Sequence, residues 1–511
     1  MKLSELLQSI DAAEIRNPAD PEIRSLCHDS RKAEPGALFF ALKGVVADGH
    51  RFLNAAVSNG AAAVVVEDFD PVPTGIPAVK VADARLAMAR IAAAFHGDPT
   101  ASLPLVGITG TNGKTTTTYL IEAIMAAAGL PPAVLGTISY RFGQTVFEAS
   151  HTTPESTELQ QALRTLADRG ARGFVMEVSS HALEQKRVDG CHFDVGIFSN
   201  LTRDHLDYHG SMEQYLEAKM RLFSELLSSD EVKPRRRAVI NLDDPSGASI
   251  AERSVCPVIT FAVGEQADVR PLNFRSTVNG ISALLQTPAG ELAIVSRLVG
   301  RFNLANILAA VSAGIALELP LDAIRTGIEG HATVPGRMER VDNGRGVTCL
   351  VDYAHTGDAL ANVLSTIKEI ATGRIITVFG CGGDRDSGKR PIMGRIAAEM
   401  SDLAIITSDN PRTEEPLRIL EQIRAGIVVP DLAGTVREYT ADELSAGFDA
   451  KGFTTVADRR EAIRLAARVA RPGDLLLLAG KGHEDYQIIG TTKHHFDDRE
   501  EAARAFAELV G

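Results

Sequence analysis

The chain has 511 residues, too many for one hydrophobic core, and this length predicts about three domains. A formal net charge of −13 argues against a nucleic-acid partner or an anionic membrane surface, and no apolar run approaches the ~20 residues of a spanning helix. The five cysteines are scattered and never in CxxC spacing, which argues against a disulfide framework or a zinc site. Because the N-terminus also lacks the apolar segment of a signal peptide, we expect a cytoplasmic protein.

Residues 1–102 form the first segment, a predicted small α/β domain. Short apolar runs predict strands at 37–42 and 62–66, and amphipathic runs predict helices at 52–59 and 85–95. Two loops rich in Asp, Ser and Gly, at 27–32 and 44–50, have the composition of turns.

The second segment, residues 103–336, begins with a candidate phosphate site in the sequence VGITGTNGKTTTTY. We expect a buried strand at 105–109, a Gly-rich turn, and a helix that runs to about residue 128. The usual GxxxxGK[ST] pattern lacks its first glycine, because Ile108 stands there. A turn of this kind can be purely structural, but the strand and helix around GKT favour phosphate binding. Lys114 would then reach the β- and γ-phosphates, and the Thr115 hydroxyl would ligate Mg²⁺.

Strands and helices alternate through the rest of this segment and through the third one, residues 337–511. In the second segment we expect further strands at 174–178, 195–199, 238–241 and 258–261, with helices at 158–168, 212–227 and 303–317. In the third we expect strands at 348–353, 375–379, 403–407 and 475–479, with helices at 359–370 and 390–400. This alternation predicts an α/β protein with mostly parallel sheets, whose ligands bind at the carboxyl ends of the strands.

Two polar clusters stand where strands of the second segment end. The first contains Glu177, Ser179 and His181, and the second contains Asp204 and His205. Each residue alone can be a polar side chain at a strand end that makes only local hydrogen bonds. Histidine is also a less usual Mg²⁺ ligand than a carboxylate. Both clusters would share one sheet edge with the phosphate loop, which favours a metal-assisted site.

Several single residues leave two interpretations open. Asn303 and Asn306, on one face of a helix, would cap its start or contact a purine ring. Arg337 would reach a phosphate across a cleft or form an interdomain ion pair. Arg412 lies in an Asn-Pro turn before a helix, where its guanidinium would grip a carboxylate or simply belong to the turn. Lys219, within a helix, is by base rates a solvated surface charge.

Ten motifs follow one another along nearly the whole chain, and together they resemble the Mur ligases, the ATP-dependent amide ligases that build the peptide stem of peptidoglycan. The motifs are TGTNGKTTT, HTTP, MEVSSHAL, NLTRDHLDYHG, FNLANILAA, PGRMER, DYAHTGDAL, GGDRDSGKRP, DNPR and GKGHE. The sequence is most similar to the members that add meso-diaminopimelate to UDP-N-acetylmuramoyl-L-alanyl-D-glutamate through an acyl phosphate. One departure is His151, where many members have Asn.

This resemblance implies a UDP-binding N-terminal domain, a central ATPase domain and a C-terminal Rossmann-like domain that binds the amino acid. The implied ATP-binding residues are Gly110, Thr111, Asn112, Gly113, Lys114, Thr115, Thr116, Asn303, Asn306 and Arg337. Those implied for the UDP-linked substrate are Ser30, Val45, Val46, Ala47, Thr152, Thr153, Ser179, Gln185 and Arg187. Those implied for diaminopimelate are Arg385, Asp409, Asn410, Pro411, Arg412, Gly480 and Glu484.

The resemblance also implies four catalytic residues, Lys114, Glu177, His205 and Lys219, and two Mg²⁺ ions. The metal ligands would be Thr115, Glu177, His205 and Lys219, the last as a CO₂-derived carbamate. The partners would be the two small-molecule substrates, without nucleic acid or a membrane span, and the chain would be a monomer.

Three alternatives are less well supported by the sequence. A lysine-adding Mur ligase is opposed by Arg412. A folylpolyglutamate synthetase has a similar TGTNGKT-type loop but is opposed by the HDSR and DNPR motifs. A P-loop nucleotide switch should contain an NKxD-type guanine motif, which the sequence lacks.

Overall fold

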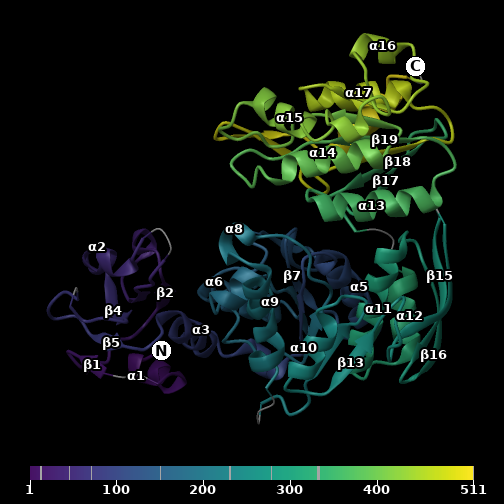
Figure 1. The fold of residues 1–511 in the computed structure, drawn as a ribbon. Helices are drawn as coiled ribbons and strands as arrows, with labels where there is room; N and C mark the ends of the chain where they lie inside the picture. The colour runs from purple at the N-terminus through teal and green to yellow at the C-terminus, as the bar shows by residue number, and fades with distance from the viewer. Residues whose placement is uncertain are drawn as a thin grey trace.

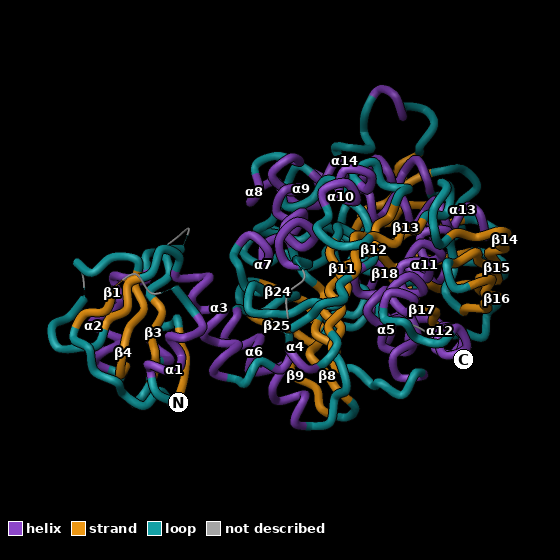
Figure 2. Tube along the Cα trace, turned by 90° about the horizontal axis from the view of Figure 1, so that it is seen from below, coloured by secondary structure: helices purple, strands orange, loops and turns teal. Residues whose placement is uncertain are grey.

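In a computed structural model, the described residues are 1–511 without 12–13, 45–46, 71, 150, 229–231, 278, 331–333 and 510–511. The chain forms three bodies, each built around a large sheet (Figure 1). Helices α3 (Ala84–Phe95) and α6 (Ser156–Asp168) lie between the N-terminal strands and the central sheet (Figure 2). None of the helices in the described ranges is long and apolar enough to cross a membrane.

The N-terminal body contains a five-stranded sheet in the order β1-β5-β4-β3-β2, in which only β1 runs antiparallel to its neighbour. Alternate residues of β3 pack on opposite faces: Leu38 and Phe40 pack with α1 (Leu3–Leu6) and α3, and Phe39 packs with α2 (Leu53–Ser58). The strands are β1 (Glu14–Arg16), β2 (Ser25–Cys27), β3 (Ala37–Phe40), β4 (Ala61–Val66) and β5 (Ala78–Lys80). The other helices are α1 (Leu3–Leu6), α2 (Leu53–Ser58) and the short η1 (Leu7–Ser9), η2 (Ser30–Lys32) and η3 (Gly49–Phe52).

The central sheet has eight strands in the order β13-β12-β11-β6-β10-β7-β8-β9, parallel from β13 to β7. All five residues of β6 are buried, because the strand lies between β10 and β11 and has helices on both faces. The chain after β6 therefore leaves from the middle of the carboxyl edge. The strands are β6 (Leu105–Thr109), β7 (Ala133–Leu135), β8 (Ser139–Phe142), β9 (Thr145–Glu148), β10 (Phe174–Glu177), β11 (Val195–Phe198), β12 (Arg237–Asn241) and β13 (Val258–Phe261).

The helices of the central body cover both faces of this sheet. They are α4 (Pro99–Ser102), α5 (Lys114–Ala127), α6, α7 (Ser180–Glu184), α8 (Leu206–His209), α9 (Met212–Arg221), α10 (Gly247–Arg253), α11 (Arg301–Ala316) and α12 (Leu321–Gly330). The helix expected at 212–227 is α9 followed by a π-helical turn, η4 (Leu222–Leu226).

A second, antiparallel sheet of the central body was not among the expected elements. Its strands, in the order β14-β15-β16, are β14 (Arg270–Thr277), β15 (Gly280–Thr287) and β16 (Gly290–Ser296). Buried and exposed residues alternate along β16, which is typical of a sheet with one face on the core and one in solvent.

The C-terminal body has a seven-stranded sheet in the order β17-β18-β23-β19-β20-β22-β21, in which only β17 is antiparallel. Its strands are β17 (Glu339–Val341), β18 (Thr348–Asp352), β19 (Ile375–Phe379), β20 (Leu403–Ile406), β21 (Arg437–Glu438), β22 (Gly452–Thr455) and β23 (Leu475–Ala479), and a hairpin adds β24 (Tyr486–Ile489) and β25 (Thr492–His495). Its helices are α13 (Gly357–Ile370), α14 (Lys389–Met400), α15 (Pro416–Arg424), η5 (Pro430–Leu432), α16 (Ala441–Ser445), α17 (Arg459–Val469) and α18 (Asp498–Ala507). The predicted α/β class is confirmed.

Candidate active site

The phosphate loop, residues 110–113, joins β6 to α5, and Asn200, the second residue after β11, holds it in place. The Thr111 N–H donates to the Asn200 carbonyl at 2.9 Å, and the Asn112 N–H donates to Asn200 Oδ1 at 2.8 Å. Gly113 (φ 87°) has no room for a side chain, because a Cβ there would lie 2.4 Å from Asn306 Oδ1 on α11. The loop is therefore fixed between β11 and α11. Ile108, where the usual pattern has glycine, lies within β6 in the core.

Lys114, the first residue of α5, turns its ammonium group back into this loop. Its Nζ donates to the carbonyls of Gly110 at 2.8 Å and Thr111 at 2.9 Å. Burial lowers the pKa of Lys114, while the nearby carboxylates of Glu177 and Asp204 raise it. The structure thus places a cation inside the turn, where phosphate oxygens would meet it.

Glu177 ends β10 beside the loop, with its side chain only 1% exposed. Its Oε1 accepts hydrogen bonds from the Thr115 hydroxyl at 3.0 Å and from the Thr137 N–H at 3.1 Å. Its Oε2 accepts from the Thr137 hydroxyl at 3.0 Å, and the Thr152 hydroxyl lies 3.1 Å from that of Thr137. These donors offset the cost of burying a carboxylate. Sequence reasoning missed Thr137, because it expected no strand at β7 and so did not recognise the turn after it as part of the carboxyl edge.

Lys219, near the end of α9, is buried with 1% exposure, so the surface-charge interpretation is wrong. Its Nζ lies 4.3 Å from the centre of the Tyr215 ring, whose hydroxyl is 3.2 Å from Thr111 Oγ1. Burial lowers the pKa of Lys219 well below its usual value, the charge of Lys114 adds to this, and Asp204 opposes it. An amine that is easily deprotonated therefore lies beside the phosphate loop.

His205, with φ of 53°, immediately precedes α8 and keeps half of its side chain exposed. Its Nε2 lies 3.4 Å from Asp204 Oδ2, and its ring meets that of His181 at 4.9 Å. Within the described ranges no three His, Cys, Asp or Glu side chains gather as a metal site. Any metal held by Glu177 and His205 would therefore need a further ligand.

The residues predicted for the UDP-linked substrate in the central body are connected to Glu177. The Thr153 hydroxyl donates to the Glu177 carbonyl at 2.8 Å and accepts from the Ser179 N–H at 3.0 Å. Arg187 donates to the Thr153 carbonyl and to Gln185 Oε1, both at 2.8 Å. The structure thus brings these predicted residues together on one side of Glu177.

Two of the residues predicted to bind the uridine end, Ser30 and Ala47, lie within the described part of the N-terminal body. Ser30 begins η2, and Ala47 is exposed in the loop before η3. Val45 and Val46 lie outside the described residues.

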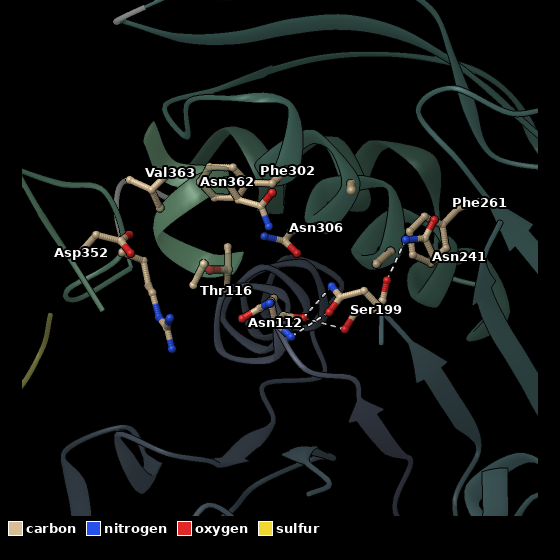
Figure 3. A pocket seen from close by; sticks show the side chains of 16 residues that line it. Asn112, Thr116, Ser199, Asn241, Phe261, Phe302, Asn306, Asp352, Asn362 and Val363 are labelled. Carbon is tan, nitrogen blue, oxygen red and sulfur yellow. Dashed lines mark hydrogen bonds between the residues drawn. The ribbon is translucent and has the colours of Figure 1, made fainter. Parts of the chain in front are cut away.

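A cavity of about 130 Å³ lies beside the phosphate loop, between the central and C-terminal bodies (Figure 3). Thr116, Asn306 and Asn362 turn toward this space, and Phe302 contributes an apolar wall. The lining residues are Asn112, Gly113, Thr116, Ser199, Asn200, Asn241, Phe261, Phe302, Ala305, Asn306, Ala309, Arg337, Asp352, Ala359, Asn362 and Val363. Apolar walls with amide groups between them suit a flat heteroaromatic ring.

Asn303 and Asn306 have different positions: Asn303 fits the helix-capping interpretation, and Asn306 fits the ring-binding one. Asn303 Nδ2 donates to the Val299 carbonyl at 2.8 Å, which stabilises the start of α11, and its Oδ1 accepts from Asn306 Nδ2 at 3.1 Å. Asn303 is buried and orients Asn306, whereas Asn306 lines the cavity.

Arg337 lies just before β17 and reaches the phosphate loop from the C-terminal side. Its Nη2 donates to Thr115 Oγ1 at 3.3 Å, and its guanidinium carbon lies 4.8 Å from the centre of the Tyr353 ring. Its buried Nε has no hydrogen-bond partner among the described residues. The Nε–H group of Arg337 can therefore donate to a ligand in the cavity.

The residues predicted for the amino acid gather where β20 and β23 end. Asn410 Nδ2 donates to Glu484 Oε2 at 2.9 Å, and the Asp409 carboxylate lies beside Gly480. Pro411 is buried in the same loop. Lys481, which the sequence analysis did not single out, is buried among these side chains.

Arg412 follows in this loop with φ of 52°, and its Nη1 donates to the Gly383 carbonyl at 2.8 Å. Arg385, in the loop after β19, is exposed. The turn interpretation also holds, because Glu415 caps α15 and its side chain accepts from the Arg418 N–H. Both guanidinium groups thus lie on the loops that follow neighbouring strands.

Three family models match the chain: the Mur ligase middle domain at residues 108–314, the Mur ligase, glutamate ligase domain at 336–482, and the Mur ligase family, catalytic domain at 22–96. A protein of Geobacter metallireducens named UDP-N-acetylmuramoyl-L-alanyl-D-glutamate--2,6-diaminopimelate ligase is 64% identical over 509 residues, which cover 100% of this chain and 99% of that protein. The chain belongs to the Mur ligase family. A second Mur ligase of the same name, from Geobacter sulfurreducens, is 60% identical and covers 99% of both chains.

The solved structures include a UDP-N-acetylmuramoyl-L-alanyl-D-glutamate--2,6-diaminopimelate ligase with a TM-score of 0.69 and 34% identity over the whole of both chains. The MurF ligase from Thermotoga maritima in complex with ADP has a TM-score of 0.58 and 18% identity, covering 95% of this Mur ligase and 98% of that chain. At this identity the second likeness concerns the fold alone.

Proposed function

We propose that this Mur ligase joins meso-diaminopimelate to UDP-N-acetylmuramoyl-L-alanyl-D-glutamate at the expense of ATP, as a step in peptidoglycan precursor synthesis. The relatives of that name are similar over nearly their full length, which supports the assignment. The observation that carries it is the phosphate loop with Lys114 turned into it and Glu177 bonded to Thr115, beside a cavity that Arg337 helps to line. Residues 1–102 would bind the uridine end, 103–336 would bind ATP, and 337–511 would bind the amino acid. A cytoplasmic location and a monomeric state stay predictions.

The cavity is the proposed site of the adenine ring. Asn306 would offer its amide to the ring edge, and Phe302 its face. The triphosphate would then extend into the loop, where the backbone N–H groups and Lys114 meet it. The ADP complex named for the MurF ligase supports nucleotide binding by this fold.

The proposed reaction begins with transfer of the ATP γ-phosphate to the terminal D-glutamate carboxylate, which gives an acyl phosphate and ADP. The neutral amine of diaminopimelate then attacks the acyl carbon, loses a proton, and expels phosphate from the tetrahedral intermediate. Lys114 and Arg337 would offset the negative charge that builds up between carboxylate and phosphate. The hydrogen bond from Arg337, just before β17, to Thr115 of the central body would help to exclude water from the acyl phosphate.

Glu177 and Thr115 would hold Mg²⁺, because the ion prefers oxygen ligands and their side-chain oxygens lie together beside the phosphate loop. When bound, the ion would neutralise phosphate charge. His205 and Lys219 would complete a second metal site only if Lys219 reacts with CO₂. In that reaction the neutral amine forms an N–C bond to CO₂, which gives a carbamate and releases one proton. The burial of Lys219 and its lowered pKa favour that neutral amine.

Arg412 and Arg385 would bind the distal carboxylate of diaminopimelate, a group that lysine lacks. Arg412→Ala is therefore expected to reduce the preference for diaminopimelate over lysine by about 10- to 100-fold, since 1.4 kcal/mol corresponds to tenfold. The effect should fall on kcat/KM for diaminopimelate. A ratio of the two kcat/KM values equal to that of the unmodified enzyme would remove Arg412 from this role, and Arg418→Ala, on the exposed start of α15, is the matched control.

The proposed function is tested by phosphate release from ATP with the UDP-linked dipeptide and either diaminopimelate or lysine. We expect release that depends on both the dipeptide and diaminopimelate, with lysine a poor substrate. Faster release with lysine would favour the lysine-adding alternative. Release that needs neither substrate would contradict the ligase assignment.

A further inference from the structure

Lys481, in the loop after β23, is fully buried and lies among polar side chains. Its Nζ is 3.2 Å from Glu484 Oε2, 3.4 Å from Asn410 Oδ1 and 3.7 Å from Asp409 Oδ1. The side chains of Asp409 and Glu484 are only 10% and 15% exposed. Three charged groups therefore share one small, poorly solvated space, where an ammonium group between two carboxylates is strongly coupled to both.

The two carboxylates would repel each other without the lysine. Burial and the neighbouring Asp409 charge raise the pKa of Glu484, while Lys481 and Asn410 lower it. Two buried carboxylates at close range share a proton instead of ionising together, unless a cation compensates them. Geometrically, Lys481 offers one positive charge to two carboxyl groups, so a second cation could also be bound between them.

A nearby guanidinium does not replace this cation. Arg459 is buried, but its Nη2 lies 2.6 Å from Asp498 Oδ2, and both side chains of this pair are fully buried. Its Nε donates to Asp498 Oδ1 at 2.8 Å, and its Nη2 also donates to the Ala479 carbonyl at 3.0 Å. Besides Lys481, the titratable and charged groups near Asp409 and Glu484 include Arg459, Tyr353, Tyr486 and Cys381.

We propose that Lys481 is a positioning residue for the ammonium end of the amino-acid substrate, because it orients Glu484 and keeps Asp409 and Glu484 ionised together before the substrate arrives. This inference rests on the proposed function. The substrate ammonium group then supplies the second positive charge and binds without displacing a proton. Asn410 fixes the geometry, since it bonds to Glu484 Oε2 while its Oδ1 accepts from the Ile488 N–H at 3.0 Å.

Lys481→Met removes the charge but keeps most of the side-chain volume. Loss of the Lys481 charge should raise the pKa of Glu484 further, so that ammonium binding must displace a proton from it. We expect KM for diaminopimelate to rise by about 30-fold or more at pH 7, with kcat changed much less. The mutant-to-wild-type ratio of KM should fall as the pH rises, by up to about tenfold per pH unit, because proton release becomes easier.

Proton release itself is the second readout. Calorimetric titration of diaminopimelate in buffers of different ionisation enthalpy should show about one more proton released by Lys481→Met than by the unmodified enzyme. Lys481→Arg keeps the charge, and its KM ratio should not depend on pH. Lys368→Met, on the exposed side of α13 in the same body, should leave both readouts unchanged.

The outcomes separate this inference from the proposed function. An unmodified enzyme that shows no diaminopimelate-dependent phosphate release contradicts the function itself. If the unmodified enzyme is active and Lys481→Met has a pH-independent KM ratio and no extra proton release, Lys481 does not control the ionisation of the pair. Equal rises in KM for ATP and for the UDP-linked dipeptide would indicate a general structural defect instead and would also overturn the proposal. Should Lys481→Met fail to fold, Lys481→Gln provides the same neutral test with a hydrogen-bond donor retained.

Discussion

Lys114→Met is expected to lower the rate of ADP formation by about 10³-fold or more, the scale seen when a cation that neutralises phosphate charge is removed. Lys114 is the cation that the structure places inside the phosphate loop, bonded to the carbonyls of Gly110 and Thr111. Methionine has a similar length but cannot neutralise the charge that develops between the γ-phosphate and the attacking carboxylate. The measurement is single-turnover ADP formation with the UDP-linked dipeptide, in the presence and absence of diaminopimelate.

The fold should tolerate this change, because the substitution removes a charge that burial disfavours. Thermal unfolding of Lys114→Met should therefore resemble that of the unmodified enzyme. Lys368→Met serves as the exposed-lysine control and should form ADP at the normal rate. ADP formation within tenfold of normal in Lys114→Met would show that the loop does not activate the carboxylate in the proposed way.

Lys219→Ala is expected to reduce phosphate release by about 10²–10³-fold, because the proposed second metal position loses its carboxylate-like ligand. Acetate or formate should restore part of the activity by occupying the space of the carbamate. A readout independent of activity is ¹³C NMR after incubation with ¹³C-labelled bicarbonate: the unmodified enzyme should show a carbamate signal that Lys219→Ala lacks. Full activity of Lys219→Ala without added carboxylate would contradict the assignment.

Lys219 should also affect how the stability of the folded protein depends on pH. Burial lowers the pKa of Lys219, so at pH values between the folded and the unfolded pKa the unfolded chain binds a proton that the folded chain does not. This difference destabilises the folded protein below the unfolded pKa of about 10.4 and diminishes as the pH rises toward it. In CO₂-free buffer, Lys219→Met should therefore be more stable than the unmodified enzyme at pH 7, with a smaller advantage at pH 9. Equal midpoints at both pH values would contradict the buried-amine description.

Much of the fold could be read from local patterns. The strands expected at 105–109, 375–379 and 475–479 coincide with β6, β19 and β23, because a fully buried parallel strand is a short apolar run bounded by turn residues. The antiparallel sheet β14–β16 was missed although its signal was present. Period-two alternation runs through β15 and β16, and it is a less prominent signal than the continuous apolar runs of the buried parallel strands.

The α/β class, the phosphate loop and the resemblance to the Mur ligases could be predicted from the sequence, because these depend on residues that are neighbours in the chain. Which side chains meet could be seen only in the folded structure. Lys219 carries the local signature of a surface lysine, yet it is buried, because the packing of α9 against the rest of the central body removes it from water. Arg337 reaches Thr115 across 222 positions, and Lys481 lies beside Asp409 only because β20 and β23 end at the same sheet edge. Burial and charge compensation arise from contacts between distant residues, so no local pattern encodes them.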